Sequence, residues 1–188
     1  MLYIKNKIMQ EIELKILDID KKNLIQKLKS KKAVKTYKGL MKIAYFDQED
    51  SRIKKADELL RLRDIGNGKV EITYKSSPQI KDGCKVYDEL ETLSENFDML
   101  CEIFEKAGLK KTMYYEKKRI QYEYKNVKFE IDTYPKIPTW VELEVKNPKI
   151  IKEILKEFEL QNHETSNLTC TKLFEIKYQK VKLNGLKF

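Results

Sequence analysis

Charged and apolar residues alternate along several short stretches of the chain. In QEIELKI, residues 10–16, Glu11, Glu13 and Lys15 take every second position, and isoleucine or leucine fills each gap. Because successive side chains of a β-strand point to opposite faces, this pattern predicts a strand with one charged and one apolar face. Strands are also predicted at residues 33–47, 57–64, 69–75, 85–93, 110–124, 127–135 and 139–146.

Apolar residues recur at helical spacing between some of these strands. One helix is predicted over 21–32, with Asp20 as its N-cap. Another is predicted over 94–108, with Ser94 as its N-cap and Gly108 as the residue that ends it.

The C-terminal part of the chain is predicted to be helical as well. Asn147 as cap and Pro148 at the first helical position start a helix over 150–160. Residues 165–188 are predicted to be a C-terminal helix or tail, weakly helical at 168–179. Breaks are predicted as loops at 48–55 and 76–83, a tight hairpin at 65–68, turns at Asn126 and at 135–138, and an interruption of the second strand at Gly39.

Composition places the chain among globular proteins. Its 188 residues are 41% hydrophobic and 37% charged, with six Gly and four Pro, which is too apolar for a disordered chain. We expect one domain over residues 1–188, of which 1–8 form an N-terminal extension.

The sequence has no run of eighteen apolar residues and no secretory leader, so the expected location is the cytoplasm. Three distant cysteines are interpreted as incidental thiols: Cys84, Cys101 and Cys170.

The formal net charge of +9 has two interpretations. It could mark a polyanionic partner such as nucleic acid, a phosphate-rich metabolite or an acidic membrane surface. Lysine is spread over the whole chain, however, together with abundant Ile, Asn and Tyr, which favours a general compositional bias. The densest lysine cluster, at 21–32, also has helical apolar spacing and is interpreted as a solvated helix face.

Charges of both signs share one face of nearly every predicted strand. They are Glu11, Glu13, Lys15, Arg61, Arg63, Lys75, Glu89, Glu91, Lys117, Arg119, Glu130, Asp132, Glu142 and Glu144. One interpretation is an antiparallel sheet whose charged face lies in water. The other is that helices cover the apolar face, so that the charged face lines a closed or nearly closed barrel. Repetition over seven strands favours the barrel, and its interior must be a wet tunnel, because an unpaired buried ion costs several kcal/mol.

The mixture of charges in such a tunnel indicates its ligand. The arginines offer planar forks that match phosphate oxygens, and the lysines add point charges. Carboxylates would repel a polyanion unless they hold Mg²⁺ or Mn²⁺, hard cations that prefer oxygen ligands and bridge phosphate groups. A triphosphate with one or two divalent cations satisfies both sets.

These motifs resemble a known family. EIELK fits the ExExK signature of the CYTH domain, or triphosphate tunnel metalloenzymes, and LRLR, TYK, ELE, EKKR, EIDTYP and VELEV follow in the family's order over about residues 9–175. The chain is most similar to the class IV adenylyl cyclase-like branch. The resemblance implies an α+β fold, an eight-stranded antiparallel β-barrel with helices outside. It does not determine which reaction is catalysed, because the family includes inorganic, thiamine and RNA triphosphatases as well as adenylyl cyclases.

The resemblance also implies roles for individual residues. The expected metal ligands are Glu11, Glu13, Asp132, Glu142 and Glu144. The expected substrate-binding cradle is Lys15, Arg61, Arg63, Lys75, Lys117 and Arg119. The expected catalytic residues are Lys75 and the water-positioning carboxylates Glu89 and Glu91. Tyr87 departs from the family pattern, which has arginine there, so one phosphate contact is missing or is made by Lys85.

Covalent catalysis is not expected. His163 is the only histidine and lies in a polar stretch interpreted as a surface loop, and the sequence has no P-loop or nucleophile-elbow motif. The remaining chemistry is direct attack of an oxygen nucleophile on phosphorus, with metal and guanidinium groups neutralising charge.

Three functions remain open at this point. The first is hydrolysis of inorganic triphosphate or a nucleoside triphosphate by a water oriented by Glu89, Glu91 or a second metal at Glu13. The second is an adenylyl cyclase, in which the ribose 3′-hydroxyl attacks the α-phosphorus of ATP. The third is a non-catalytic module that binds polyphosphate or nucleic acid; nucleic acid is expected as a partner only in this case, and no membrane partner is expected. The oligomeric state, monomer or homodimer, is left open.

Overall fold

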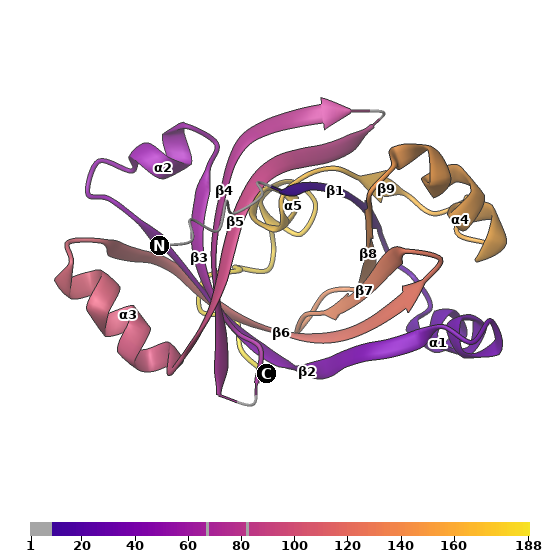
Figure 1. Ribbon diagram of the computed structural model, residues 1–188, viewed down its shortest axis with the longest axis horizontal. Coiled ribbons are helices and arrows are strands. Elements are labelled where there is room, and N and C mark those ends of the chain that lie inside the picture. Colours follow the sequence, from indigo (N-terminus) through magenta and orange to yellow (C-terminus); the bar gives the residue numbers. More distant parts are fainter. Residues whose placement is uncertain (1–8, 67, 82) are drawn as a thin grey trace, which may run out of the picture.

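A ring of eight strands forms the centre of the molecule (Figure 1). The computed structural model describes residues 9–66, 68–81 and 83–188, without the side chains of 9–11, 81, 84 and 85, so the expected N-terminal extension lies outside the described residues. The strands are β1 (Met9–Ile16), β2 (Val34–Asp47), β3 (Leu59–Asp64), β4 (Lys69–Lys81), β5 (Cys84–Glu95), β6 (Lys110–Tyr124), β7 (Val127–Thr133) and β8 (Trp140–Val145).

The strands pair in the order β5-β4-β3-β2-β6-β7-β8-β1, and a further β1–β5 pairing closes the ring. Every pairing is antiparallel. Strand β1 is the closing element, because one edge pairs with β8 and the other with β5. The predicted α+β class and the closed antiparallel sheet of eight strands are confirmed. A ninth strand of two residues, β9 (Thr165–Ser166), was not predicted and pairs with the end of β1.

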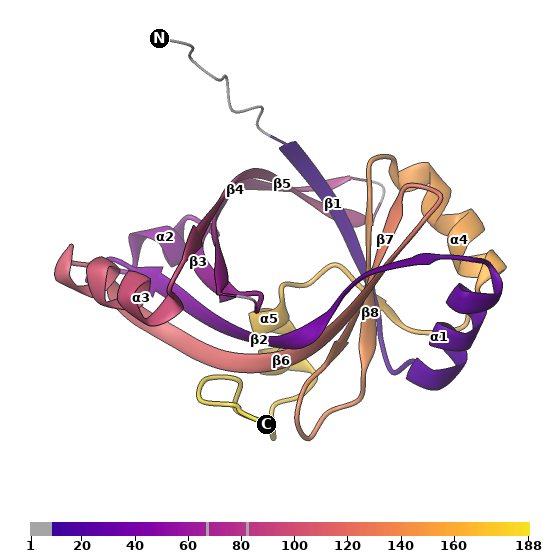
Figure 2. The same ribbon diagram turned by 60° about the horizontal axis from the view of Figure 1, so that its bottom comes forward.

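Helices pack against the outer, apolar face of the ring (Figures 1 and 2). They are α1 (Lys21–Ser30), α2 (Arg52–Lys55), α3 (Phe97–Lys106), α4 (Ile151–Glu157), preceded by the 3₁₀ turn η1 (Pro148–Ile150), and α5 (Cys170–Ile176), which lies apart from the others. Leu28 of α1 and Ile154 of α4 belong to one apolar core with Phe129 and Leu143 of the ring. Helix α3 covers a second core around Leu62. None of the helices in the described part of the chain is long and apolar enough to cross a membrane.

Side chains that accept backbone hydrogen bonds start several of these helices. The Asp20 carboxylate accepts from the amide of Lys22 at 2.8 Å, as the sequence predicted for its N-cap. Helix α2 was predicted as loop, but the Asp47 carboxylate accepts from the amides of Ile53 and Lys54 at 3.1 and 2.9 Å and stabilises one helical turn.

The start of α3 was predicted wrongly. Ser94, the predicted N-cap, lies in β5 opposite Val70. The N-cap is Asn96, whose side chain accepts from the amide of Met99 at 3.1 Å. Asn96 has a φ of 61°, a left-handed conformation that asparagine adopts more readily than most residues, so the chain turns there from strand to helix.

Two breaks in the strands were also predicted wrongly. The loop at 76–83 is mostly strand, because β4 and β5 continue pairing up to Lys81 and Cys84. A register shift between Ser76 and Gln79 accommodates Pro78, which has no amide hydrogen to donate. Gly39 does not interrupt β2, since it pairs with Arg119 in the middle of the β2–β6 ladder.

Candidate active site inside the ring

The charged face predicted from the alternation is the inner face of the ring. Cross-strand neighbours bring opposite charges together, as in Lys15 with Glu142, Arg119 with Asp132 and Lys75 with Glu89. Five of the predicted site residues are at most 6% exposed: Lys15, Lys75, Lys117, Arg119 and Asp132. This burial rules out the interpretation of the charged face as a solvated sheet surface.

Lys15 lies at the centre of the β1–β8 side of the interior. Its Nζ is 3.1 Å from Glu13 Oε1 and 2.5 Å from Glu142 Oε1. Burial alone would lower the pKa of Lys15, but the two carboxylates outweigh burial and raise it above the ordinary lysine value. Lys15 therefore stays charged despite being 2% exposed.

Asp132 holds two of the predicted cradle cations. Arg119 donates from Nε to Asp132 Oδ1 and from Nη2 to Oδ2, both at 2.7 Å, and Lys117 Nζ donates to Oδ2 at 2.7 Å. Arg119 also pairs with Glu130 and Glu142. Burial would raise the pKa of Asp132, but Arg119 and Lys117 hold it below its usual value. Asp132 was predicted to be a metal ligand; in this structure both of its oxygens accept hydrogen bonds from cations.

Strands β3, β4 and β5 form the other side of the interior. Arg61 Nη2 donates to Thr73 Oγ1 at 3.3 Å, and Thr73 Oγ1 donates in turn to Glu91 Oε2 at 3.5 Å. Arg63 forms an ion pair with Glu71. Partial burial and the Glu71 charge raise the pKa of Glu91 above its ordinary value, although part of the residue remains exposed to solvent.

Lys75 lies between a carboxylate and an aromatic ring. Its Nζ is 3.5 Å from Glu89 Oε2 and 5.3 Å from the centre of the Tyr87 ring. Tyr87, which stands where the family pattern has an arginine, is 3% exposed and lies beside this cation. The side chain of Lys85, the predicted substitute for that arginine, lies outside the described residues, as does that of Glu11.

Among the described residues, one buried cationic donor in the interior has no acceptor. Arg61 Nε is buried and makes no hydrogen bond within the part of the chain that the structure describes. An unpaired buried N–H of a charged group is costly, so a ligand that accepts from it would be bound favourably. Phosphate oxygens are suitable acceptors for a guanidinium.

The C-terminal segment lies across one end of the interior, here called the closed end. Leu173 and Phe174 of α5 form an apolar core with Leu17, Tyr134 and Trp140, which lie where β1, β7 and β8 meet that end. Pairing of β9 with β1, a 3.3 Å hydrogen bond from Asn167 Nδ2 to Gly83 O and a 3.7 Å ion pair of Lys172 with Asp57 hold the segment on the ring. The weak helical prediction for 168–179 is confirmed by α5.

The opposite end, here called the open end, keeps contact with solvent. The side chains of Glu71, Glu144 and Lys128 lie there and are 16%, 24% and 44% exposed. Glu13, Glu142 and Glu89, deeper in the ring, still keep 13–14% exposure. A ligand can therefore reach the charged interior from this end.

The carboxylates have the right chemistry for a hard divalent cation. Glu13 lies opposite Glu144, and Glu130 lies opposite Glu142, on the neighbouring strands β1, β8 and β7. Burial raises the pKa of Glu13 and of Glu144, and neighbouring carboxylates raise it further, a crowding of negative charge that a bound cation would relieve. Among the residues whose side chains are described, no three carboxylates converge on one point.

Some residues of the interior were not predicted. Glu71 and Thr73 share the parity of Lys75 in VEITYK, so the alternation could have revealed them. The sequence offers no comparable signal for the aromatic residues that line the closed end. His163 lies outside the interior, with Nδ1 3.1 Å from Leu17 O, and Cys101 and Cys170 are free thiols.

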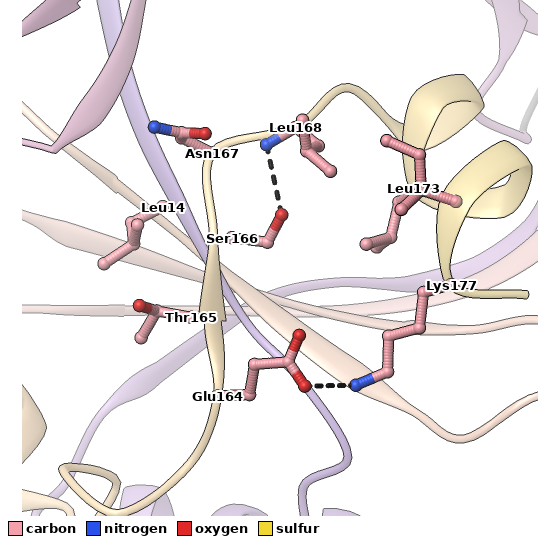
Figure 3. A pocket seen from close by; sticks show the side chains of 9 residues that line it. Leu14, Glu164, Thr165, Ser166, Asn167, Leu168, Leu173 and Lys177 are labelled. Carbon is pink, nitrogen blue, oxygen red and sulfur yellow. Dashed lines mark hydrogen bonds and ion pairs between the residues drawn. The ribbon is translucent and has the colours of Figure 1, made fainter.

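A hollow of about 320 Å³ lies on the outside of the ring, between β9 and α5 (Figure 3). Outward-facing Leu14 forms part of its wall, and the Glu164–Lys177 ion pair, at 2.5 Å, borders it. None of the predicted site residues lines this hollow. The chemistry is therefore expected inside the ring.

Comparison with known proteins agrees with this geometry. Residues 9–172 match the model of the CYTH domain family. A protein of Methanocaldococcus jannaschii, named as a proposed adenylate cyclase, is 26% identical over 175 residues, which are 90% of this chain and 99% of the relative.

Solved structures show the same fold. A protein of Pyrococcus horikoshii is 26% identical with a TM-score of 0.70, covering 85% of this chain and 96% of its own. A Hippeastrum protein, described as an adenylyl cyclase homologue with a dominant triphosphatase activity, is 16% identical with a TM-score of 0.64, covering 88% of this chain and 94% of its own. At that identity the likeness concerns the fold alone.

Proposed function

Because the chain belongs to the CYTH domain family, whose members process triphosphates, we propose that it is a divalent-metal-dependent hydrolase of a phosphoanhydride bond. Its substrate is inorganic triphosphate or a nucleoside triphosphate bound inside the ring. One observation carries the proposal: the buried Nε of Arg61, in an interior that also contains the buried cations Lys15, Lys75, Lys117 and Arg119, has no acceptor among the described residues.

The cations bind the triphosphate. Arg61 and Arg63 reach it from β3, Lys75 from β4 and Lys15 from β1. Phosphate oxygens would replace the carboxylate partners of Arg63, Lys75 and Lys15 and would supply the acceptor that Arg61 Nε lacks among the described residues. Arg119 and Lys117 are held in place by Asp132, which we therefore assign as a positioning residue rather than a metal ligand.

Glutamates of the β1–β8 side hold the metal. Glu13 and Glu144 face each other there, with Glu142 beside them, and Glu11 belongs to the same strand. Mg²⁺ or Mn²⁺ held by these glutamates would neutralise negative charge on the phosphate oxygens.

Glu91 orients the water. Its raised pKa suits a general base, whereas Glu89 is paired with Lys75. In the hydrolysis, the water oxygen bonds to the terminal phosphorus and the water proton passes to Glu91. The bridging P–O bond breaks, its electron pair stays on the oxygen of the leaving diphosphate or nucleoside diphosphate, and orthophosphate is the other product. Lys75 neutralises charge that develops on the leaving oxygens.

An adenylyl cyclase is the second candidate. The name of the Methanocaldococcus jannaschii relative favours it, and the same cations could hold ATP with its α-phosphorus near the 3′-hydroxyl. A non-catalytic polyphosphate-binding module is less well supported, because the interior glutamates would serve no purpose in it.

The test is incubation of the purified protein with inorganic triphosphate or with ATP, each with Mg²⁺ or Mn²⁺. We expect orthophosphate from inorganic triphosphate, and at least a 100-fold loss of kcat in Lys75→Ala, a loss of the size seen for removal of one transition-state-stabilising donor. Lys38→Ala removes an exposed lysine of β2 and should leave the rate unchanged.

The reaction products distinguish the hydrolase, the cyclase and the non-catalytic module. Cyclic AMP and pyrophosphate from ATP would favour the cyclase. Tight binding without any of the three products would favour the non-catalytic module. Removal of the metal with EDTA should stop either reaction, and activity that survives EDTA would contradict the metal-dependent proposal.

A further inference from the structure

A tyrosine ring lies flat on the backbone of β2 inside the ring. Tyr37 folds over Gly39, two residues further along the same face, so that a Cβ atom on Gly39 would be 2.4 Å from Tyr37 Oη and 2.9 Å from Cζ. Any other residue at 39 would push the ring away. The Tyr37 ring thus explains why position 39 has no side chain. The sequence alone predicted only that Gly39 interrupts the strand.

This ring lies beside the proposed phosphate cradle. Gly39 pairs with Arg119, and Tyr37 pairs with Gln121 on the same neighbouring strand. Burial raises the pKa of Tyr37; the charges of Arg119 and Arg63 act against that rise, and those of Asp64 and Glu71 add to it. Tyr37 is only half-buried.

The position of Tyr37 along the strand determines which part of a bound triphosphate would lie next to it. Tyr37 lies near the start of β2, away from the ends of β1, β7 and β8 that α5 covers, and packs against the near side of the apolar core that extends from that end. A triphosphate that enters from the open end must place its phosphates deepest, among the buried cations. Whatever is attached to the phosphate chain then remains at the open end, next to Tyr37.

We propose that Tyr37 is a specificity-determining residue, whose ring stacks on the base of a nucleoside triphosphate. One ring face rests on Gly39, and the solvent-accessible remainder is available to a flat apolar group. The inference rests on the proposed function only in that it takes the interior to be the triphosphate site. Inorganic triphosphate has no base and makes no such contact.

The test compares two ligands without turnover. ATP and inorganic triphosphate are titrated calorimetrically into the metal-free protein and into Tyr37→Ala, Tyr37→Phe and Gly39→Ala. Tyr37→Ala should raise the Kd for ATP about tenfold, within the range expected for loss of one base–aromatic stack, and change the Kd for inorganic triphosphate less than twofold. Tyr37→Phe keeps the ring and should bind both ligands like the unmodified protein.

Gly39→Ala gives an independent check. It leaves Tyr37 in the sequence but removes the space for its ring, and should reproduce the selective loss of ATP affinity. Equal losses for both ligands, or no loss for ATP in Tyr37→Ala, would overturn the inference. Failure of the unmodified protein to bind either ligand would overturn the proposed function and this inference with it. Circular dichroism shows that each variant is folded.

Discussion

At the scale of single residues, ion pairs between neighbouring strands stabilise the interior, as around Asp132. Asp132 is 0% exposed, yet it accepts three hydrogen bonds from Arg119 and Lys117. Removal of one partner from such a group leaves an uncompensated buried charge. The alternation of EIDTYP predicted that Asp132 faces inward, but not which side chains it meets, because partners come from another strand.

The Asp132 network predicts a large loss of stability in Asp132→Asn. We expect the free energy of unfolding to fall by about 3–5 kcal/mol, which for a chain of this size corresponds to a decrease in Tm of about 6–20 °C. Thermal denaturation at pH 7 measures it. Glu144→Gln is the control, because the pair it forms with Lys128 is partly exposed and contributes about 1 kcal/mol or less. A native-like Tm for Asp132→Asn would contradict its role as a positioning residue.

At the scale of elements, α5 is held mainly by aromatic packing. Phe174 is buried and contacts the rings of Tyr134, Trp140 and Tyr178 edge to face, with centroid distances of 5.4–6.3 Å. Such contacts bury large apolar areas and add a favourable aromatic interaction. The closed end therefore depends on a few side chains of a seven-residue helix.

Phe174→Ala should accordingly destabilise the protein by about 3–5 kcal/mol, because it leaves a cavity in this core. Ile176 of the same helix is 59% exposed, so Ile176→Ala should change the stability by no more than about 0.5 kcal/mol. Urea denaturation of the two variants compares them directly. Equal effects would mean that α5 does not pack on the ring as described.

The contact between α4 and β6 should weaken in acid. A hydrogen bond from the Tyr124 hydroxyl at 2.7 Å, together with Lys125 and Lys31, lowers the pKa of Glu157 to about 2. A pKa lowered by folding adds stability that is present above the unfolded value, about 4.5, and is lost as the pH falls towards 2.

Glu157→Gln should therefore reduce the stability at pH 7 by no more than about 1 kcal/mol, since the ion pairs are partly exposed. The difference from the unmodified protein should shrink between pH 4.5 and pH 2. Chemical denaturation over this pH range measures it, and a difference that stays constant would rule out Glu157 as its source.

Sequence periodicity located the elements better than their boundaries. All eight strands of the ring and helices α1, α3 and α4 lie where alternation or helical spacing placed them. The errors arose at boundaries that are determined by pairing between strands rather than by the local sequence. Strands β4 and β5 extend because each supplies the other's hydrogen bonds, and α3 starts at Asn96 because β5 continues through Ser94.

At the scale of the whole molecule, the C-terminal segment covers one end of the ring, so the proposed site is reached from the other end. The closed end is covered by the C-terminal segment, a feature that the sequence did not predict because residues 165–188 show only a weak pattern. Closure of the sheet itself was predictable from charge, since a row of ions on seven strands needs an enclosed, hydrated space. The order of the strands was not predictable, because nothing in EIELKI specifies β5 and β8 as its neighbours.

If the phosphate chain enters only from the open end, the protein should prefer ligands with a free phosphate end. Adenosine tetraphosphate has such an end, whereas diadenosine tetraphosphate carries a nucleoside at both. We expect the second to compete with inorganic triphosphate at least tenfold more weakly in a metal-free competition titration. Equal competition would mean that the phosphate chain passes through the ring or binds elsewhere.

The pairing of β1 also has a consequence for synthesis of the chain. The first described strand to leave the ribosome is among the last to be paired on both edges, because one of its partners is β8. Roughly 130 residues separate Ile16 from the end of β8, so at about 5–20 residues per second β1 waits roughly 6–26 s for that partner. During this time its alternating charges, Glu11, Glu13 and Lys15, disfavour pairing with a neighbouring nascent chain. The residues proposed to hold metal and phosphate in the mature enzyme thus also protect an unpaired edge while the protein is being made.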